Sequence, residues 1–165
     1  MFIKTWRFVM LMLATFSVSL SMTHLLELLP RMRFEERLWV EVTVFQGVYT
    51  LFGSVGAVFE CGAIVTAFIV AFLVRRRGQT FYWTASGAIV LLVAFVSWIL
   101  FVAPMNTVFA TWLTNPVPPD WTRYRNQWEY AHAINAFIKI AGLSLLLLSV
   151  IMETPERVTV QSQQQ

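Results

Sequence analysis

The chain of 165 residues is too apolar for a soluble globular domain. Hydrophobic residues make up 58% of it and charged residues 13%, and the mean hydropathy is +0.65, values typical of a multispanning membrane protein. This length accommodates about four spans of roughly 20 residues with short loops, and no separate soluble domain. The net charge of +3 does not indicate nucleic-acid binding, because the basic residues cluster at the ends of apolar segments, where they set orientation.

Four apolar segments are long enough to span a lipid bilayer, the partner that the composition implies. They cover residues 8–29, 48–74, 82–103 and 130–152. Each is predicted to be a helix, since an isolated strand cannot satisfy its backbone hydrogen bonds in lipid. The expected fold is an all-α integral membrane four-helix bundle, a single domain over residues 1–152, followed by a polar, disordered tail at 153–165 with no assigned role. Cys61 is the only cysteine, which excludes an internal disulfide and a thiolate metal cluster.

Basic residues predict which side of the membrane each segment end faces. Lys4 and Arg7 precede the first segment, and three arginines at 75–77 separate the second from the third, so these positions mark the cytoplasmic side. Both termini are then cytoplasmic, and the protein is expected in the cell membrane. Aromatic residues near the segment ends are expected to anchor the helices at the two interfaces. They are Trp6, Tyr82 and Trp83 on the inner side, and Trp39, Trp112, Trp121, Trp128 and Tyr130 on the outer side.

The first segment has a second interpretation. Two basic residues followed by an apolar stretch to Met22 also describe a secretory signal, with small residues at 17–19 or 19–21 as the cleavage site. Apolar residues resume at 25–29, before Pro30, and extend the segment to a spanning length. We therefore favour a first helix that is retained.

Five polar residues are expected at similar depth, in the outer half of the bundle. Counted from the cytoplasmic end of each helix at about 1.5 Å per residue, they lie roughly 18 to 28 Å up. They are His24, Glu60, His132, Asn135 and Lys139. Leaving a carboxylate or an ammonium group at the centre of a span costs about 2.5 to 3.5 kcal/mol on insertion scales. Glu60 and Lys139 are therefore expected to avoid lipid and to pair with each other.

Helical spacing directs these residues toward the bundle interior, because each belongs to a line of positions three or four residues apart. The lines are Ser17, Ser21, His24 and Glu27 on the first helix, Tyr49, Gly53, Gly56 and Glu60 on the second, and His132, Asn135, Lys139 and Gly142 on the fourth. Glycines in such a line let a neighbouring backbone approach closely. The third helix offers only Ser97 and Trp98 at this level and is expected to be a packing wall.

One interpretation of this polar level is a cofactor site. His24 and His132 are the only histidines, and two imidazoles on facing helices could bind haem axially. Together with Glu60 or Glu27 they could instead bind a divalent metal. No histidine pair on a single helix has metal-ligand spacing, so the sequence does not choose between these groups.

A cofactor-independent site and a purely structural one are the other interpretations. One histidine could act as a general base toward an aromatic or quinone-like substrate, while Lys139 or Asn135 stabilises a developing oxyanion. Alternatively, the same polar groups satisfy one another and hold the four helices together.

The outer loop adds candidates near the fourth helix. Asn106 follows Pro104, which is expected to end the third helix. Arg125 and Trp128 lie seven and four residues before His132, so they share its face and support it if the helix begins early. The remaining loop tryptophans either cover the site or anchor the loop at the interface, and we favour anchoring.

These residues resemble the pattern of a known family. The run Pro104-Met105-Asn106, followed by Trp112, Pro118-Pro119-Asp120-Trp121, Arg125, Trp128 and His132, resembles the anthrone-oxygenase-like family of small four-helix membrane proteins. The stretch from His24 to Met32 is similar to a signature of one bacterial branch. The resemblance implies four helices and, by analogy with fungal members, oxygenation of a polycyclic aromatic. Many members carry arginine where this chain has Asn135, and Lys139, one turn further, could substitute for it.

Two classes of function follow. The first is a membrane enzyme, an oxygenase-like oxidoreductase that acts on a lipophilic aromatic or quinone-like compound through His24, Glu60, His132 and Lys139. Glu27, Asn106, Arg125, Trp128 and Asn135 would bind the substrate or support these groups. The second is a non-catalytic accessory subunit or small transporter, in which the same residues pack the helices or handle protons.

Overall fold

The computed structural model describes residues 1–153 of the chain, which are helical throughout apart from short turns and one loop. The elements are α1 (Phe2–Met32), α2 (Glu36–Val40), the π-helix η1 (Glu41–Phe45), α3 (Val48–Leu73), α4 (Gln79–Phe101), α5 (Ala103–Thr111) and α6 (Trp121–Ile151). Four helical stretches, α1, α3, α4 with α5, and α6, are long and apolar enough to cross a membrane. The all-helical, four-span architecture expected from the sequence is thus present within the described residues.

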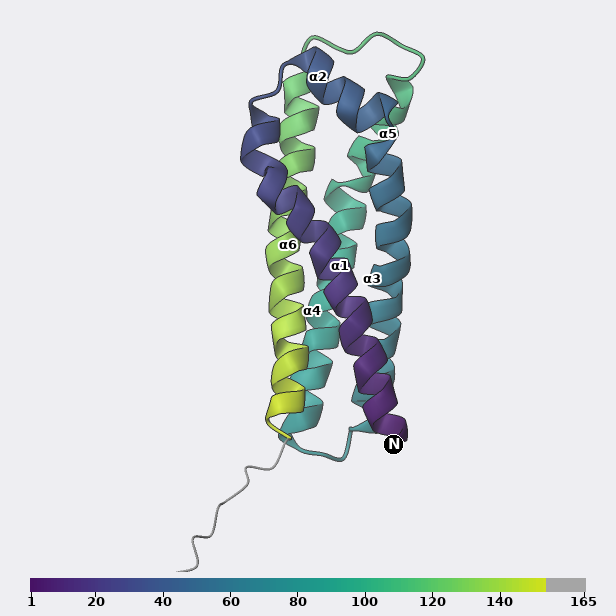
Figure 1. Cartoon of the computed structure of the whole chain (residues 1–165), viewed down its shortest axis with the longest axis vertical. Helices are drawn as coiled ribbons and strands as arrows, with labels where there is room; N and C mark the ends of the chain where they lie inside the picture. Colours follow the sequence, from purple (N-terminus) through teal and green to yellow (C-terminus); the bar gives the residue numbers. More distant parts are fainter. Residues whose placement is uncertain (154–165) are drawn as a thin grey trace, which may run out of the picture.

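The long helices form an elongated bundle in which α1 is inclined to the others (Figure 1). It packs against both α3 and α6, and α6 also packs along α4. In Figure 1, α1 starts beside the lower part of α3 and crosses toward the upper part of α6. The N-terminus, the α3–α4 turn and the end of α6 lie at one end of the bundle, which we call the basic end after its arginines at 75–77. The short elements α2, η1 and α5 cover the opposite, capped end.

Helix boundaries differ from the sequence prediction chiefly at the capped end. The first helix was expected to stop before Pro30 but continues to Met32, because a proline in the last turn breaks few backbone hydrogen bonds. The last helix begins at Trp121 rather than at residue 130, which adds more than two turns. After a break at Val102, the chain resumes as α5 with Pro104 in its first turn, where a missing N–H costs nothing.

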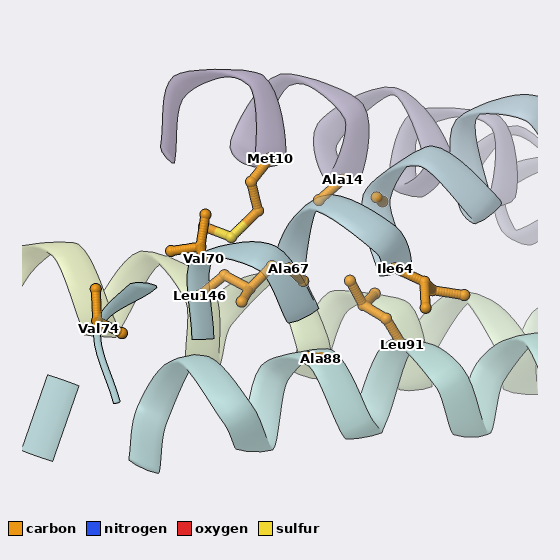
Figure 2. Packing of buried hydrophobic residues seen from close by; sticks show 10 residues of the cluster. Met10, Ala14, Ile64, Ala67, Val70, Val74, Ala88, Leu91 and Leu146 are labelled. Atoms are coloured by element: carbon orange, nitrogen blue, oxygen red, sulfur yellow. The ribbon is translucent and has the colours of Figure 1, made fainter. Parts of the chain in front are cut away.

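Small residues bring α4 and α6 into close contact near the basic end. A Cβ atom added at Gly87 would lie 2.7 Å from Cδ2 of Leu146, and one added at Gly142 would lie 2.8 Å from Cδ2 of Leu91. Each leucine therefore occupies the space that the facing glycine leaves free. Figure 2 shows Leu91 and Leu146 in the same apolar cluster as side chains of α1 and α3. The cluster contains Met10, Ala14, Ala63, Ile64, Ala67, Val70, Val74, Ala88, Leu91 and Leu146.

The capped end has an aromatic core, and this corrects the expected role of the tryptophans. The tryptophans at 39, 112, 121 and 128 were predicted to anchor at a membrane interface, yet all four are buried. They pack with Tyr49 and Phe109 because α2, η1, α5 and the early turns of α6 fold over one another. Only Tyr130 of the expected outer group is exposed.

An ion-pair cluster joins three segments at the basic end. The carboxylate of Glu153 pairs with the guanidinium groups of Arg7 from α1 and Arg77 from the α3–α4 turn. Burial raises the pKa of Glu153, but the hydrogen bonds and positive charges of the two arginines outweigh this and lower it overall. Glu153 was expected to belong to a tail without a role, so this position is a correction. The rest of the predicted tail, 154–165, lies outside the described residues.

Candidate functional site

A cavity of about 40 Å³ lies between the long helices on the capped side of the apolar cluster. It receives side chains from α1, α3, α4, α5 and α6. Its lining residues are Ser17, Leu20, Ser21, His24, Tyr49, Phe52, Gly53, Gly56, Ala57, Glu60, Phe95, Trp98, Asn106, Trp128, His132 and Lys139. Both histidines, Glu60 and Lys139, which the sequence placed at one level, therefore meet in one cavity.

The two imidazoles are stacked on each other. The ring centroids of His24 and His132 are 4.0 Å apart, with an angle of 14° between the planes. Trp128 makes T-shaped contacts with both rings, at 5.1 Å from His24 and 4.4 Å from His132, and Phe52 makes another with His24 at 5.1 Å. Two imidazolium ions in this contact would repel each other, so the arrangement suits a pair in which at least one ring is neutral.

The expected pair of Glu60 and Lys139 is formed. Lys139 Nζ donates to Glu60 Oε2 at 2.8 Å, and each side chain is only 7% exposed. The pair links α3 to α6 directly below the histidines. Because both groups are buried, removing either partner leaves the other as an uncompensated charge. The second oxygen of this carboxylate, Oε1, is buried and has no hydrogen-bond partner among the described residues.

Trp128 and Asn106 form the wall of the cavity on the capped side. Trp128 Nε1 donates to Asn106 Oδ1 at 2.8 Å. Trp128 is 1% exposed, and its indole separates the histidine pair from the aromatic core. Asn106 reaches this position because the break at Val102 turns α5 over the end of the bundle. The third span is thus more than a packing wall, since Phe95 and Trp98 of α4 also line the cavity.

The donor groups do not fit haem or a divalent metal. Within residues 1–153, no group of three His, Cys, Asp or Glu side chains is close enough to hold a metal ion. Of the two carboxylates that the sequence suggests as a further ligand, Glu60 is paired with Lys139 through Oε2, and Glu27 is half exposed and lies beside Arg31. Axial haem ligands lie on opposite faces of the porphyrin, whereas His24 and His132 are stacked face to face with no space between them. His24 and His132 are therefore not placed to bind either group.

Three other candidates lie outside the cavity lining. Glu27 has a side chain that is 52% exposed and lies 3.8 Å from Arg31, because it is rotated about 60° from His24 around the helix axis. Asn135 is buried, but its Nδ2 donates to the Ala94 carbonyl at 2.6 Å and so joins α6 to α4. Arg125 lies over Trp121 at 4.8 Å and donates to the Phe34 carbonyl at 3.3 Å, within the cap.

Sequence reasoning missed a second buried ion pair behind Trp128. Arg31 Nε donates to Glu129 Oε1 at 2.7 Å, and Trp39 Nε1 donates to the same oxygen at 2.8 Å. The guanidinium also donates to the hydroxyl of Thr43 and lies 5.7 Å from the centre of the Trp128 ring. Arg31 and Glu129 both lie outside the predicted spans 8–29 and 130–152, where a charge needs no partner. The available signal was spacing: Arg31 follows His24 by seven residues, about two helical turns, and so continues its face.

Comparisons of the chain with protein-family models, with curated proteins and with solved structures found no match. The resemblance to the anthrone-oxygenase-like family therefore stays a prediction. The site is defined by its own geometry: a stacked histidine pair and a buried ion pair on one cavity, inside four apolar helices.

Proposed function

We propose that this chain is an integral membrane oxidoreductase of the oxygenase type, acting without a bound cofactor on a lipophilic aromatic or quinone-like compound. The observation that carries the proposal is the His24–His132 stack, which puts two imidazoles on a cavity walled by aromatic rings and beside the Lys139 ammonium. Aromatic walls suit a flat apolar ligand, and a neutral imidazole suits proton abstraction. The resemblance of the 104–132 region to the anthrone-oxygenase-like family points the same way.

The proposed reaction uses dioxygen as the oxidant and the histidine pair as the base. An imidazole removes a proton from a CH₂ carbon activated by neighbouring aromatic and carbonyl groups, and Lys139 stabilises the enolate oxygen that results. The carbanion forms a carbon–oxygen bond with O₂, and breakage of the oxygen–oxygen bond leaves a carbonyl group. The carbon loses four electrons and O₂ gains them. One oxygen atom enters the product, and the other leaves as water with the two protons of the CH₂ group.

The substrate would enter along α3. The cavity of about 40 Å³ is large enough for O₂ or a few waters but not for a polycyclic molecule. A Cβ atom added at Gly56 would have no neighbour within 4 Å, and at Gly53 the nearest would be Asn106 Nδ2 at 4.0 Å. Both glycines and Phe52 are partly exposed, so this wall of the cavity is open toward the surface. A flat ring seated against the two glycines would contact the histidines without displacing backbone.

The proposed location is the cell membrane, with both termini in the cytoplasm. Lys4, Arg7 and the arginines at 75–77 all lie at the basic end, and positive residues favour the cytoplasmic side. The cavity then lies in the outer half of the membrane. Continuous helical structure through residues 17–21, where α1 packs against α3 and α6, supports a retained first helix.

A non-catalytic role as an accessory subunit or a small transporter is the second candidate. It is favoured by the pairing of Lys139 with Glu60, which leaves no unpaired charge for a reaction to use. On this alternative the histidines and the ion pair hold the bundle together or handle protons.

Dioxygen consumption by the purified protein in lipid nanodiscs distinguishes the two candidates. The protein would be supplied with three-ring keto-phenols that carry an activated CH₂ group, under isotopically labelled O₂. We expect substrate-dependent oxygen uptake, one labelled atom in the product, and loss of both in His132→Ala. Tyr130→Phe, which changes an exposed ring on the same helix, is the matched control and should keep the activity. Failure of every substrate class to be oxidised would favour the non-catalytic alternative.

A further inference from the structure

Three buried polar atoms on the cavity lining have no hydrogen-bond partner among the described residues. They are Ser17 Oγ, His24 Nδ1 and Glu60 Oε1. Their residues are 2%, 6% and 5% exposed, so these atoms are shielded from the surroundings even though the α3 wall of the cavity is partly exposed. Leaving a buried polar atom unpaired is costly, which makes three such atoms around one cavity an unfavourable arrangement unless something inside satisfies them.

The cavity has the size and chemistry that ordered water requires. A single water needs about 10 to 15 Å³ of such volume and two to four polar partners, so a cavity of about 40 Å³ has room for two or three molecules. Ser17, Ser21 and His24 follow one another on the same face of α1, over about 10 Å of helix axis. Waters about 2.8 Å apart can bridge that length in three or four hydrogen bonds.

We infer that the cavity holds a chain of two or three water molecules that connects the Glu60 carboxylate to the His24 imidazole past the Ser17 and Ser21 hydroxyls, forming a proton relay. A proton received by the histidine pair passes along the waters to Glu60 Oε1. Each water accepts one proton and releases one, so none is consumed. Lys139 keeps its own proton and holds the other carboxylate oxygen, which leaves Oε1 as the receiving atom.

The groups around the relay come from every helix that lines it. The titratable groups that line the cavity are His24 from α1, Tyr49 and Glu60 from α3, and His132 and Lys139 from α6, while Arg31 of α1 lies behind Trp128, outside this lining. Helices α4 and α5 contribute only Phe95, Trp98 and Asn106 to the cavity lining. Glu60 is therefore the one carboxylate on the cavity lining, and it is the acceptor to which protons from the histidines would go.

The relay deepens the proposed function, on which its role in a reaction rests, because it would store the proton taken by the base until the departing oxygen accepts that proton and leaves as water. The water chain itself does not depend on any substrate. It can therefore be tested in the resting protein.

Magnetic resonance of isotope-labelled histidine in nanodiscs tests the relay, because the chain contains only two histidines and their signals are few. In the wild-type protein we expect magnetisation transfer from water to the His24 ring. Ser17→Val removes the hydroxyl and should abolish the transfer. Gly56→Leu fills the cavity from the α3 side, where a Cβ meets no atom within 4 Å, and should abolish it without removing a polar group. Ser19→Val is the matched control: Ser19 is exposed, two residues from Ser17, and should leave the transfer unchanged.

A second measurement tests the proton path. In Glu60→Gln we expect water contact to persist, since an amide oxygen remains, while exchange of the imidazole N–H for deuterium becomes several-fold slower. Absence of water contact in the wild type, or its persistence in both Ser17→Val and Gly56→Leu, would overturn the relay. Unchanged exchange in Glu60→Gln would overturn the carboxylate's part in it. If water contacts the histidine pair but the protein oxidises no substrate, the proposed function is refuted while the water chain is retained.

Discussion

Arg31 and Glu129 form a buried ion pair between α1 and α6, with Nε and Oε1 2.7 Å apart and the two residues 98 positions apart in the chain. Their side chains are 5% and 0% exposed. The pair ties the first helix to the last at the capped end. It also contacts Trp128, which in turn packs against both histidines. Its integrity therefore affects both the stability of the bundle and the shape of the cavity.

Removing one partner of this pair should destabilise the protein strongly. Glu129→Ala leaves the Arg31 guanidinium buried without its carboxylate, and such losses typically cost about 3 to 5 kcal/mol. We expect a clearly lower unfolding temperature in detergent. Glu27→Ala is the control, since Glu27 is half exposed and 3.8 Å from the same arginine. Equal effects of the two substitutions would contradict the distinction between a buried and an exposed partner.

The contact between α4 and α6 should not tolerate a single added methyl group. Gly142→Ala places Cβ 2.8 Å from Leu91 Cδ2, so the leucine must leave its position, and such overpacking usually costs about 1 to 3 kcal/mol. Adding Leu91→Ala to this variant should recover part of the loss. Gly56→Ala, where the new Cβ meets no atom within 4 Å, serves as the control and should be neutral or slightly stabilising. The measurement is the thermal unfolding temperature of the wild type, Gly142→Ala, Gly142→Ala with Leu91→Ala, and Gly56→Ala.

Acid should weaken the ion-pair cluster at the basic end. Because the two arginines lower the pKa of Glu153 in the folded protein, its carboxylate stabilises the fold at neutral pH, and this contribution disappears as the pH falls through that lowered pKa. We expect Glu153→Gln to reduce stability at pH 7 and to make no difference well below pH 4. Glu36→Gln, at an exposed position in the cap, should show no such pH dependence. A Glu153→Gln effect of equal size at both pH values would count against the pairing.

His132→Ala should separate activity from assembly. His132 lies near the outer end of the apolar part of α6, where a histidine contributes little to insertion energy, so we expect normal amounts of variant protein in the membrane together with loss of substrate oxidation. Quantitative immunoblotting of membrane fractions, alongside the oxygen assay, measures both. If the variant fails to accumulate, the stack of His24 and His132 is primarily a structural contact, and this result supports the non-catalytic alternative.

The sequence predicted the parts of the site that follow from helical spacing and from the cost of charge in lipid. His24, Glu60, His132 and Lys139 lie where spacing placed them, because an apolar span with one polar line has a single favourable orientation. Glu27 and Asn135 follow the same lines but do not line the cavity. Each follows a histidine by three residues and is therefore rotated about 60° from it around the helix axis, toward a different neighbour.

The structure of the capped end could not be predicted from helical spacing or from the cost of charge in lipid. Trp39, Trp112 and Trp121 occur near segment ends, where interfacial anchoring is the usual explanation, and nothing local shows that α2, η1 and α5 fold over them. The long-range pairing of Arg31 with Glu129 depends on α6 beginning at Trp121, more than two turns before its apolar stretch. Hydropathy locates the membrane-crossing part of such a helix and not its polar extension.

The Arg7–Glu153–Arg77 cluster brings the start and the end of the described chain together. The beginning of α1 and the end of α6 therefore lie close together at the basic end of the bundle. A circularly permuted chain, joined by a short linker at that point and opened in the loop at 113–119, would keep every helix whole. The order in which the helices are synthesised would change, with α6 preceding α1, so such a permutant would reveal whether insertion of the bundle depends on which helix enters the membrane first.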